Sequence, residues 1–318
     1  MAAECAYGRQ NGVLGAFGTS RTVGRVARKR PRRAPWVAMK VFLSVDMEGI
    51  SGLTDPEEMR AGGRGYERGC ELMTGDANAA IRAAFDAGAE RVVVTDSHGS
   101  GKNLRADLID ERCTLVRGPY KPMRMGEGLD PSFDVALYVG YHARAGAPRG
   151  VLNHTWMGRE IQNVHLNGDV AGEIRLMAAY AGSLGVPVGL VAGDEAACEE
   201  ARDVLGGVET VAVKTGRDRY AAELIPPARA QALIYERTLR ALHNPEGWHR
   251  LTIPAPYTLR VEWNSTSIAQ SCSLIPGVKL ADPRTTEFTT SDYSDVVGLL
   301  GVCATLAGDI GCTGRQYG

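Results

Sequence analysis

Apolar and polar positions alternate from Met39 onward in a way that predicts short strands separated by helices. The strand-like runs are rich in Val, Ile and Leu and lie at 40–45, 91–95, 113–116, 135–139, 188–191 and 210–213. Helical spacing of apolar residues is found between them, at 67–87, 169–184 and 194–205. Near-continuous apolar strands are typical of parallel sheets that are covered on both faces. The pattern therefore predicts an α/β fold with a mainly parallel sheet and flanking helices, similar to a Rossmann fold.

The pattern changes after the Pro226-Pro227 pair, which marks a break in the chain. Beyond it we expect a helix over 228–242, strands at 257–263 and 285–289, and a last helix over 292–306. These elements are enough for a smaller α/β unit. The sequence thus predicts three parts: a basic, disordered extension at 1–38, a main α/β domain at 39–225 and a smaller α/β domain at 226–318.

The extension contains the basic run RKRPRR at 28–33. Such runs are found in nucleic-acid-binding arms and transit peptides, but also in solvated tails. The segment lacks the apolar stretch of a secretory signal. Acidic side chains outnumber basic ones in the rest of the chain, so we expect no nucleic-acid partner. We favour an unstructured extension, which translation from an upstream start codon would explain.

Composition narrows the class of protein further. The 318-residue chain is 44% hydrophobic and 23% charged, which is typical of a globular protein and excludes a disordered one. No stretch approaches the roughly 18 uninterrupted apolar residues that span a membrane, so we expect no membrane partner. Seven scattered cysteines form no CxxC pair, which argues against disulfides and a cysteine zinc site. We therefore expect reduced thiols in a cytoplasmic protein, in which His, Asp and Glu must hold any metal.

Chemically capable side chains follow three of the predicted strands. Asp46 and Glu48 come directly after the first strand, His98 follows the second, and His142 follows the strand at 135–139. Ligands of open α/β sheets bind beyond the carboxyl ends of the strands, where these residues lie. Each residue alone fits a solvated turn or a hydrogen-bonded structural histidine. Their repetition along one edge of the sheet favours a shared site.

Two further residues complete the candidate set. Glu173 falls in the first turn of a predicted helix, where it either complements the helix dipole or reaches the sheet edge, and His154 lies in the loop after His142. Two imidazoles and three carboxylates without a thiolate suit Zn²⁺ or Mn²⁺. Five ligands are too many for one catalytic zinc ion but hold two ions when one carboxylate bridges them. Such a pair activates water and polarises a carbonyl or phosphoryl oxygen.

The motifs together resemble those of the D-aminopeptidase family, peptidase family M55. They occur in the family's order: SVDMEGISG at 44–52, DSH at 96–98, GYHAR at 140–144, NHT at 153–155 and GE at 172–173. The likeness extends from Met39 to about residue 306, and the basic extension has no counterpart in it. The resemblance implies a binuclear zinc aminopeptidase that acts on short peptides with an N-terminal D-amino acid. It also implies a homo-oligomer, a decameric ring.

The resemblance further implies roles for individual residues. Asp46 would bridge two Zn²⁺ ions per subunit, with Glu48 and His142 on one side and His98 and Glu173 on the other. His154 would be the catalytic histidine, and we favour a general base over a nucleophile because a water between two metal ions is already activated. Asn153 stands where the family often has Ser, which puts the local hydrogen bonding of His154 in question.

Other functions remain open at this point. A two-metal amidase or phosphoesterase would use the same ligands, although AGGRG at 61–65 does not match a phosphate-binding loop. A metal-stabilised subunit that only binds peptides is a non-enzymatic alternative. Trp156 and Met157 fit a specificity pocket or core packing equally well, and Lys214 fits a salt bridge or a substrate contact. The remaining histidines fit structural or surface positions: His165, His243 and His249.

Overall fold

The computed structural model describes residues 39–314, so the expected extension at 1–38 lies outside the described residues. Its central sheet has the strand order β3-β2-β1-β4-β7-β8-β9. All neighbours are parallel except the β8–β9 hairpin. The α/β prediction with a mainly parallel sheet is therefore confirmed. The strand bounds are β1 (Met39–Val45), β2 (Ala89–Asp96), β3 (Thr114–Val116), β4 (Val135–Tyr141), β7 (Val188–Asp194), β8 (Glu209–Asp218) and β9 (Ala221–Leu224).

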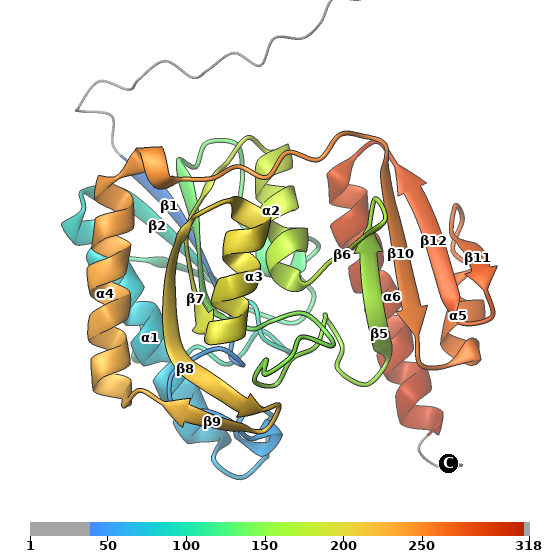
Figure 1. Ribbon diagram of the computed structural model, residues 1–318, viewed down its shortest axis with the longest axis horizontal. Coiled ribbons are helices and arrows are strands. Elements are labelled where there is room, and N and C mark those ends of the chain that lie inside the picture. Colours follow the sequence, from blue (N-terminus) through green and yellow to red (C-terminus); the bar gives the residue numbers. More distant parts are fainter. Residues whose placement is uncertain (1–38, 315–318) are drawn as a thin grey trace, which may run out of the picture. The chain divides into compact units, whose positions relative to one another are not determined.

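Helices cover both faces of this sheet (Figure 1). Successive side chains of a strand point to opposite faces, and β1 shows the consequence. Val41 and Leu43 pack with α1 (Tyr66–Asp86) and α4 (Pro227–His243), whereas Phe42 belongs to the core formed with α2 and α3. Of these helices, α2 spans Glu173–Ser183 and α3 spans Glu195–Leu205. Both faces of the central strands are thus buried, as their continuous apolar sequence indicates.

A second, antiparallel sheet has the order β11-β12-β10-β5-β6. Its buried residues Leu259, Val261 and Trp263 pack with α2 and with α6 in one hydrophobic core. The element bounds are β5 (Ile161–Leu166), β6 (Asp169–Val170), β10 (Tyr257–Trp263), β11 (Lys279–Asp282), β12 (Thr285–Thr290), α5 (Thr266–Cys272) and α6 (Tyr293–Gly314). Three 3₁₀ turns are η1 (Pro56–Glu58), η2 (Arg124–Gly126) and η3 (Pro245–Gly247).

The two sheets exchange segments along the chain. β5 and β6 precede residue 225 but belong to the second sheet, while α4 follows it and covers the first (Figure 1). The division into domains at residue 225 stays a prediction. The helix expected over 169–184 begins only at Glu173, because Asp169 and Val170 first pair with β5 in a hairpin.

α6 is the most apolar long helix among residues 39–314. By length and composition, Tyr293–Cys312 is able to cross a membrane. About a third (33%) of this stretch is buried, including Val296, Leu300 and Cys303, which pack in the core beside the second sheet. The six cysteines of the described part of the chain are free thiols, and four of them are buried: Cys70, Cys198, Cys272 and Cys303.

Candidate active site

The candidate site lies at the carboxyl ends of β2, β1 and β4, which are neighbours in the central sheet. Backbone hydrogen bonds continue the pairing just beyond the strands. The Asp46 N–H donates to the Val139 carbonyl at 2.8 Å, and the Ser97 N–H donates to the Val45 carbonyl at 2.7 Å. The backbone around Asp46 and His98 is therefore fixed by the sheet and not by flexible loops.

Two glycines allow β1 and β4 to approach each other where the site begins. Gly140 has a φ of 76°, and a Cβ there would lie 2.1 Å from the Asp46 carbonyl oxygen. A Cβ on Gly49 would lie 1.8 Å from the Tyr141 carbonyl oxygen. No side chain fits at such distances, so this approach of the two strand ends requires glycine at both positions.

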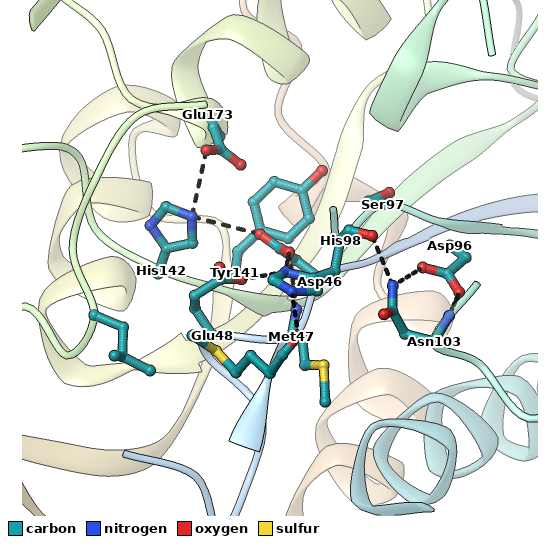
Figure 2. A network of polar contacts seen from close by, with 12 residues as sticks. Asp46, Met47, Glu48, Asp96, Ser97, His98, Asn103, Tyr141, His142 and Glu173 are labelled. Atoms are coloured by element: carbon teal, nitrogen blue, oxygen red, sulfur yellow. Dashed lines mark hydrogen bonds and ion pairs between the residues drawn. The ribbon is translucent and has the colours of Figure 1, made fainter. Parts of the chain in front are cut away.

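All six predicted site residues converge in one cluster, and Figure 2 shows five of them: Asp46, Glu48, His98, His142 and Glu173. His98 Nδ1 lies 3.0 Å from Glu48 Oε2 and 3.5 Å from Asp46 Oδ1. His142 Nε2 lies 3.5 Å from Asp46 Oδ2 and 3.4 Å from Glu173 Oε1. His154 is more distant, with Nε2 3.8 Å from oxygens of both Glu48 and Glu173. The side chains that follow β1, β2 and β4 thus meet at one edge of the sheet, where one side chain from a loop and one from α2 join them.

Each histidine of the cluster has one ring nitrogen on a backbone carbonyl. The pairs are His98 Nε2 with Met59 at 3.1 Å, His142 Nδ1 with Ala143 at 3.0 Å and His154 Nδ1 with Leu152 at 2.9 Å. A carbonyl only accepts, so these nitrogens carry the N–H. The other nitrogen of each ring faces the carboxylates. Histidines that bind metals are held in this way, with the second N–H donated to a carbonyl or carboxylate.

Because the carboxylates of the cluster are buried and repel one another, a positively charged partner would stabilise them. Burial, followed by the charge of Glu48, raises the pKa of Asp46 from 3.8 to about 7. Asp46 Oδ2 and His142 Nε2 are both buried and have no hydrogen-bond partner among residues 39–314. Buried polar atoms without a partner are costly. A divalent cation between these atoms would satisfy both.

The imidazoles respond to the same charges. Burial alone would lower the pKa of His98, but Glu48 and Asp46 outweigh it and raise this pKa well above 6.5. His142 behaves alike, since Glu173 and the other carboxylates outweigh its burial. Burial would likewise raise the pKa of Glu48, yet His98 holds it well below its usual range. The carboxylates of the cluster therefore stabilise positive charge at His98 and His142.

The donor atoms form three overlapping groups, in each of which they lie within 4.8 Å of one another. The groups are Asp46, Glu48 and His98; Asp46, His142 and Glu173; and Glu48, His142 and His154. Imidazole nitrogens and carboxylate oxygens fit zinc in both number and type. Glu48 lies with His98 in one group and with His142 in another, and Glu173 lies with His142. The pairing of ligands that the resemblance implied therefore stays a prediction.

His154 is held in a strained loop. Leu152 and Trp156 have φ angles of 54° and 64°, which non-glycine residues rarely adopt. The Trp156 N–H donates to Glu173 Oε1 at 2.6 Å, and the Asn153 side chain donates to two carbonyls of its own loop. Asn153 thus braces the loop, and the Leu152 carbonyl orients His154. Burial and the neighbouring His142, on which the ring stacks at 4.1 Å, lower the pKa of His154.

A cavity of about 330 Å³ opens beside the cluster. Trp156 and Met157 line it, together with Lys121, the Ser97–Gly99 backbone region and Thr305 of α6. The cavity lies between the carboxyl edge of the central sheet and α6. Its volume is near the lower limit for small-molecule sites, which suits a ligand of a few residues.

Two buried residues support the loops of the site. The Asp96 carboxylate accepts N–H groups of Asn103 and Leu104, and the Asn103 side chain also donates to the His98 carbonyl (Figure 2). Lys214 is fully buried and donates to the Glu48 carbonyl and, at 2.8 Å, to the Leu53 carbonyl. Lys214 therefore supports the loop that carries Asp46 and Glu48.

Some contributors carry no signal in the sequence. The Met59 carbonyl orients His98, but a backbone oxygen is present at every residue and marks no motif. Lys121 lies far from the motifs in sequence and was not singled out. The three remaining histidines stay outside the cluster, and His165 lies 3.1 Å from Glu262 on the second sheet.

A buried set of nitrogen and oxygen donors at the carboxyl edge of a parallel sheet, with a further histidine beside a small cavity, fits a metal-dependent hydrolase. Comparison with known proteins gives the family. The profile of the D-aminopeptidase family, peptidase M55, matches residues 39–302. The chain therefore belongs to this family and is a metallo-aminopeptidase, which confirms the resemblance found in its motifs.

Two relatives illustrate the match. The D-aminopeptidase of Bacillus subtilis (strain 168) is 39% identical over 270 residues, which cover 85% of this chain and 98% of the relative. The solved structure of the Zn-dependent D-aminopeptidase DppA from Bacillus subtilis, described as a self-compartmentalizing protease, has a TM-score of 0.82 and 38% identity. That comparison also covers 85% of this chain and 98% of the other.

Proposed function

We propose that this protein is a zinc aminopeptidase that holds two ions and removes an N-terminal D-amino acid from short peptides. The observation that carries the proposal is the sharing of Asp46 by two groups of donor atoms, one with Glu48 and His98 and one with His142 and Glu173. A carboxylate has two oxygens and is able to bridge two ions. Mn²⁺ or another divalent ion fits the same donors.

The residues of the cluster have different roles in hydrolysis. Zinc, when bound, polarises the carbonyl of the first peptide bond and makes water a better nucleophile. Nε2 of neutral His154 takes a proton from the attacking water and then gives it to the leaving amine. The Leu152 carbonyl holds the Nδ1–H of this ring, so Nε2 keeps its lone pair toward the carboxylate cluster. Direct attack by the imidazole is the second choice, because a water between two metal ions is already activated.

The substrate and assembly are proposed from the relatives and from the cavity. Both relatives are described as D-aminopeptidases, and the walls around the cluster, including Trp156 and Met157, are placed to distinguish the two hands of an amino acid. One relative is described as self-compartmentalizing. We extend this to a cytoplasmic homo-oligomer, a decameric ring, whose mass sedimentation analysis would measure.

A panel of dipeptides paired by stereochemistry at the first residue tests the proposal on protein of measured zinc content. We expect hydrolysis of the D-first peptides, loss of activity with a chelator, and recovery with zinc. Asp46→Asn removes the shared carboxylate, so both zinc content and activity should fall. Asp203→Asn, an exposed acid on α3, is the matched control and should change neither. Equal rates on both hands, or activity without metal, would contradict the proposal.

A further inference from the structure

The Lys121 side chain lines the same cavity as the metal-ligand cluster. Its ammonium donates to the hydroxyl of Thr95 at 3.2 Å and to the Asp96 carbonyl, both at the end of β2. An ammonium has three N–H donors, so these two acceptors leave one donor free. The lysine is therefore anchored at the cavity wall and still able to bind a ligand.

No carboxylate within residues 39–314 forms an ion pair with Lys121. The carboxylate of Asp96 is occupied by Asn103 and Leu104, and that of Glu127 accepts the Met123 N–H. The neighbouring Arg124 also lines the cavity, and it too is held by neutral oxygens: the carbonyls of Pro119 and Gly301 and the hydroxyl of Thr305. Among residues 39–314, these two cations thus share one cavity without a carboxylate partner of their own.

The cavity therefore carries charges of both signs. Asp46, Glu48 and Glu173 line it with their metal-binding geometry, and Lys121 lines it from the loop between β3 and η2. A free peptide has the complementary arrangement, with an ammonium at its first residue and a carboxylate at its last. In a dipeptide or tripeptide the carboxylate lies only one or two residues beyond the scissile bond, about 3.5 Å for each residue.

We propose that Lys121 binds the C-terminal carboxylate of a short peptide and so makes the enzyme prefer peptides with a free carboxyl end. The proposal rests on the proposed function, because it assumes that the scissile bond lies at the cluster. A carboxylate on a substrate side chain has the same chemistry. It lies at a different place along the peptide, so the choice of probes separates the two sources.

The test compares D-alanyl-D-alanine with its C-terminal amide, and with the amide of D-alanyl-D-aspartate, which carries only a side-chain carboxylate. We expect the wild-type protein to favour the free acid over both amides in kcat/KM. Lys121→Met should lower this preference by roughly 10- to 100-fold, the contribution of one charge-assisted hydrogen bond, and Lys121→Arg should restore part of it. Lys102→Met, an exposed lysine outside the cavity, should keep the wild-type preference.

Three outcomes would overturn the inference. Equal activity of the wild-type protein on acid and amide would do so, and so would an equal loss on all three peptides in Lys121→Met, which would make Lys121 only a brace of the His98 loop. A better rate on the aspartate amide than on the free acid would assign the lysine to side chains instead. Binding of the three peptides, measured by calorimetry on the zinc-loaded protein, decides the question even if none is hydrolysed.

Discussion

The three histidines of the cluster differ in the direction in which their surroundings shift the pKa. His98 and His142 lie within 3.5 Å of carboxylate oxygens, and these charges raise the pKa of each ring well above 6.5. His154 lies at 3.8 Å and stacks on His142, so burial and that neighbour lower its pKa. The first two thus suit binding of a cation, and the third suits a base that stays neutral.

His154→Ala separates catalysis from metal binding. We expect kcat to fall by roughly 10² to 10⁴, the usual contribution of a general base, while the zinc content stays that of the wild type. Since the pKa of His154 is lowered from 6.5, the acid limb of kcat/KM against pH in the wild type should lie below 6.5. His165→Ala, outside the cluster, is the control. Unchanged kcat, or lost zinc, would contradict the assigned role.

At the residue scale, the sequence predicts what depends on local order. Asp46, Glu48, His98 and His142 were predicted together because each follows a strand directly, and parallel strands end at one edge. Which of these ligands share an ion stays a prediction, since Glu48 belongs to one group with His98 and to another with His142. Lys121 reaches Asp96 from 25 positions away, a contact that no local pattern contains.

At the scale of elements, the site depends on how closely β1 and β4 approach. The Gly49 N–H donates to the Gly140 carbonyl at 2.8 Å, just where Asp46 and Glu48 leave β1. Lys214 of β8 adds a second support from below through the Glu48 and Leu53 carbonyls. The two carboxylates are therefore positioned by hydrogen bonds from their loop to β4 and β8. The loop after β1 that carries them has little freedom.

Gly140→Ala tests this approach. A Cβ there meets the Asp46 carbonyl at 2.1 Å in addition to a left-handed φ of 76°. Gly88→Ala is a matched control, because Gly88 has a φ of 90° but no atom near its Cβ position. The control should lose about 1 kcal/mol of unfolding free energy. Gly140→Ala should lose about 1–3 kcal/mol more, together with zinc. Equal losses in denaturant titrations would show that the contact is unimportant.

At the scale of the whole molecule, the largest gap in sequence-based prediction is the second sheet. β5 pairs with β10 through contacts such as Val164 with Val261, and nearly a hundred residues separate them. β5 and β6 are short, and their pairing depends on this distant partner. The central sheet was predictable because each parallel strand carries its own continuous apolar run. In the antiparallel sheet, β10 and β12 match the strands expected at 257–263 and 285–289, whereas their pairing with β5 could not be read from a local pattern.

The stability of the metal-free protein should depend on pH in a defined direction. Asp46 has a folded pKa of about 7 against an ordinary 3.8, so the folded state binds more protons and stability falls as pH rises between these values. His98 and His142, with raised pKa values, contribute stability that is present below 6.5 and is lost as pH rises through their folded values. Glu48 and Glu173, with lowered pKa values, lose their contribution only as pH falls below 4.5.

Zinc should therefore stabilise the protein more at higher pH, because it replaces the protons that these groups hold. We expect the rise in Tm on adding zinc to be larger at about pH 8 than at about pH 6. When free zinc is in hundredfold excess over Kd, each site adds about 2.7 kcal/mol to the free energy of unfolding. His165→Gln should keep this dependence, and Asp46→Asn should weaken it. A zinc effect that is the same at both pH values would contradict the assignment of these residues as ligands.

The backbone carbonyls that hold the three imidazoles have an evolutionary consequence. Met59, Ala143 and Leu152 supply an oxygen that any amino acid would supply equally well. Drift at these three positions can leave the tautomers of the histidines untouched as long as the chain keeps its course. Selection on the imidazole orientation is then exerted on the path of the polypeptide, and homologues can be expected to retain the metal chemistry while the side chains at these positions diverge.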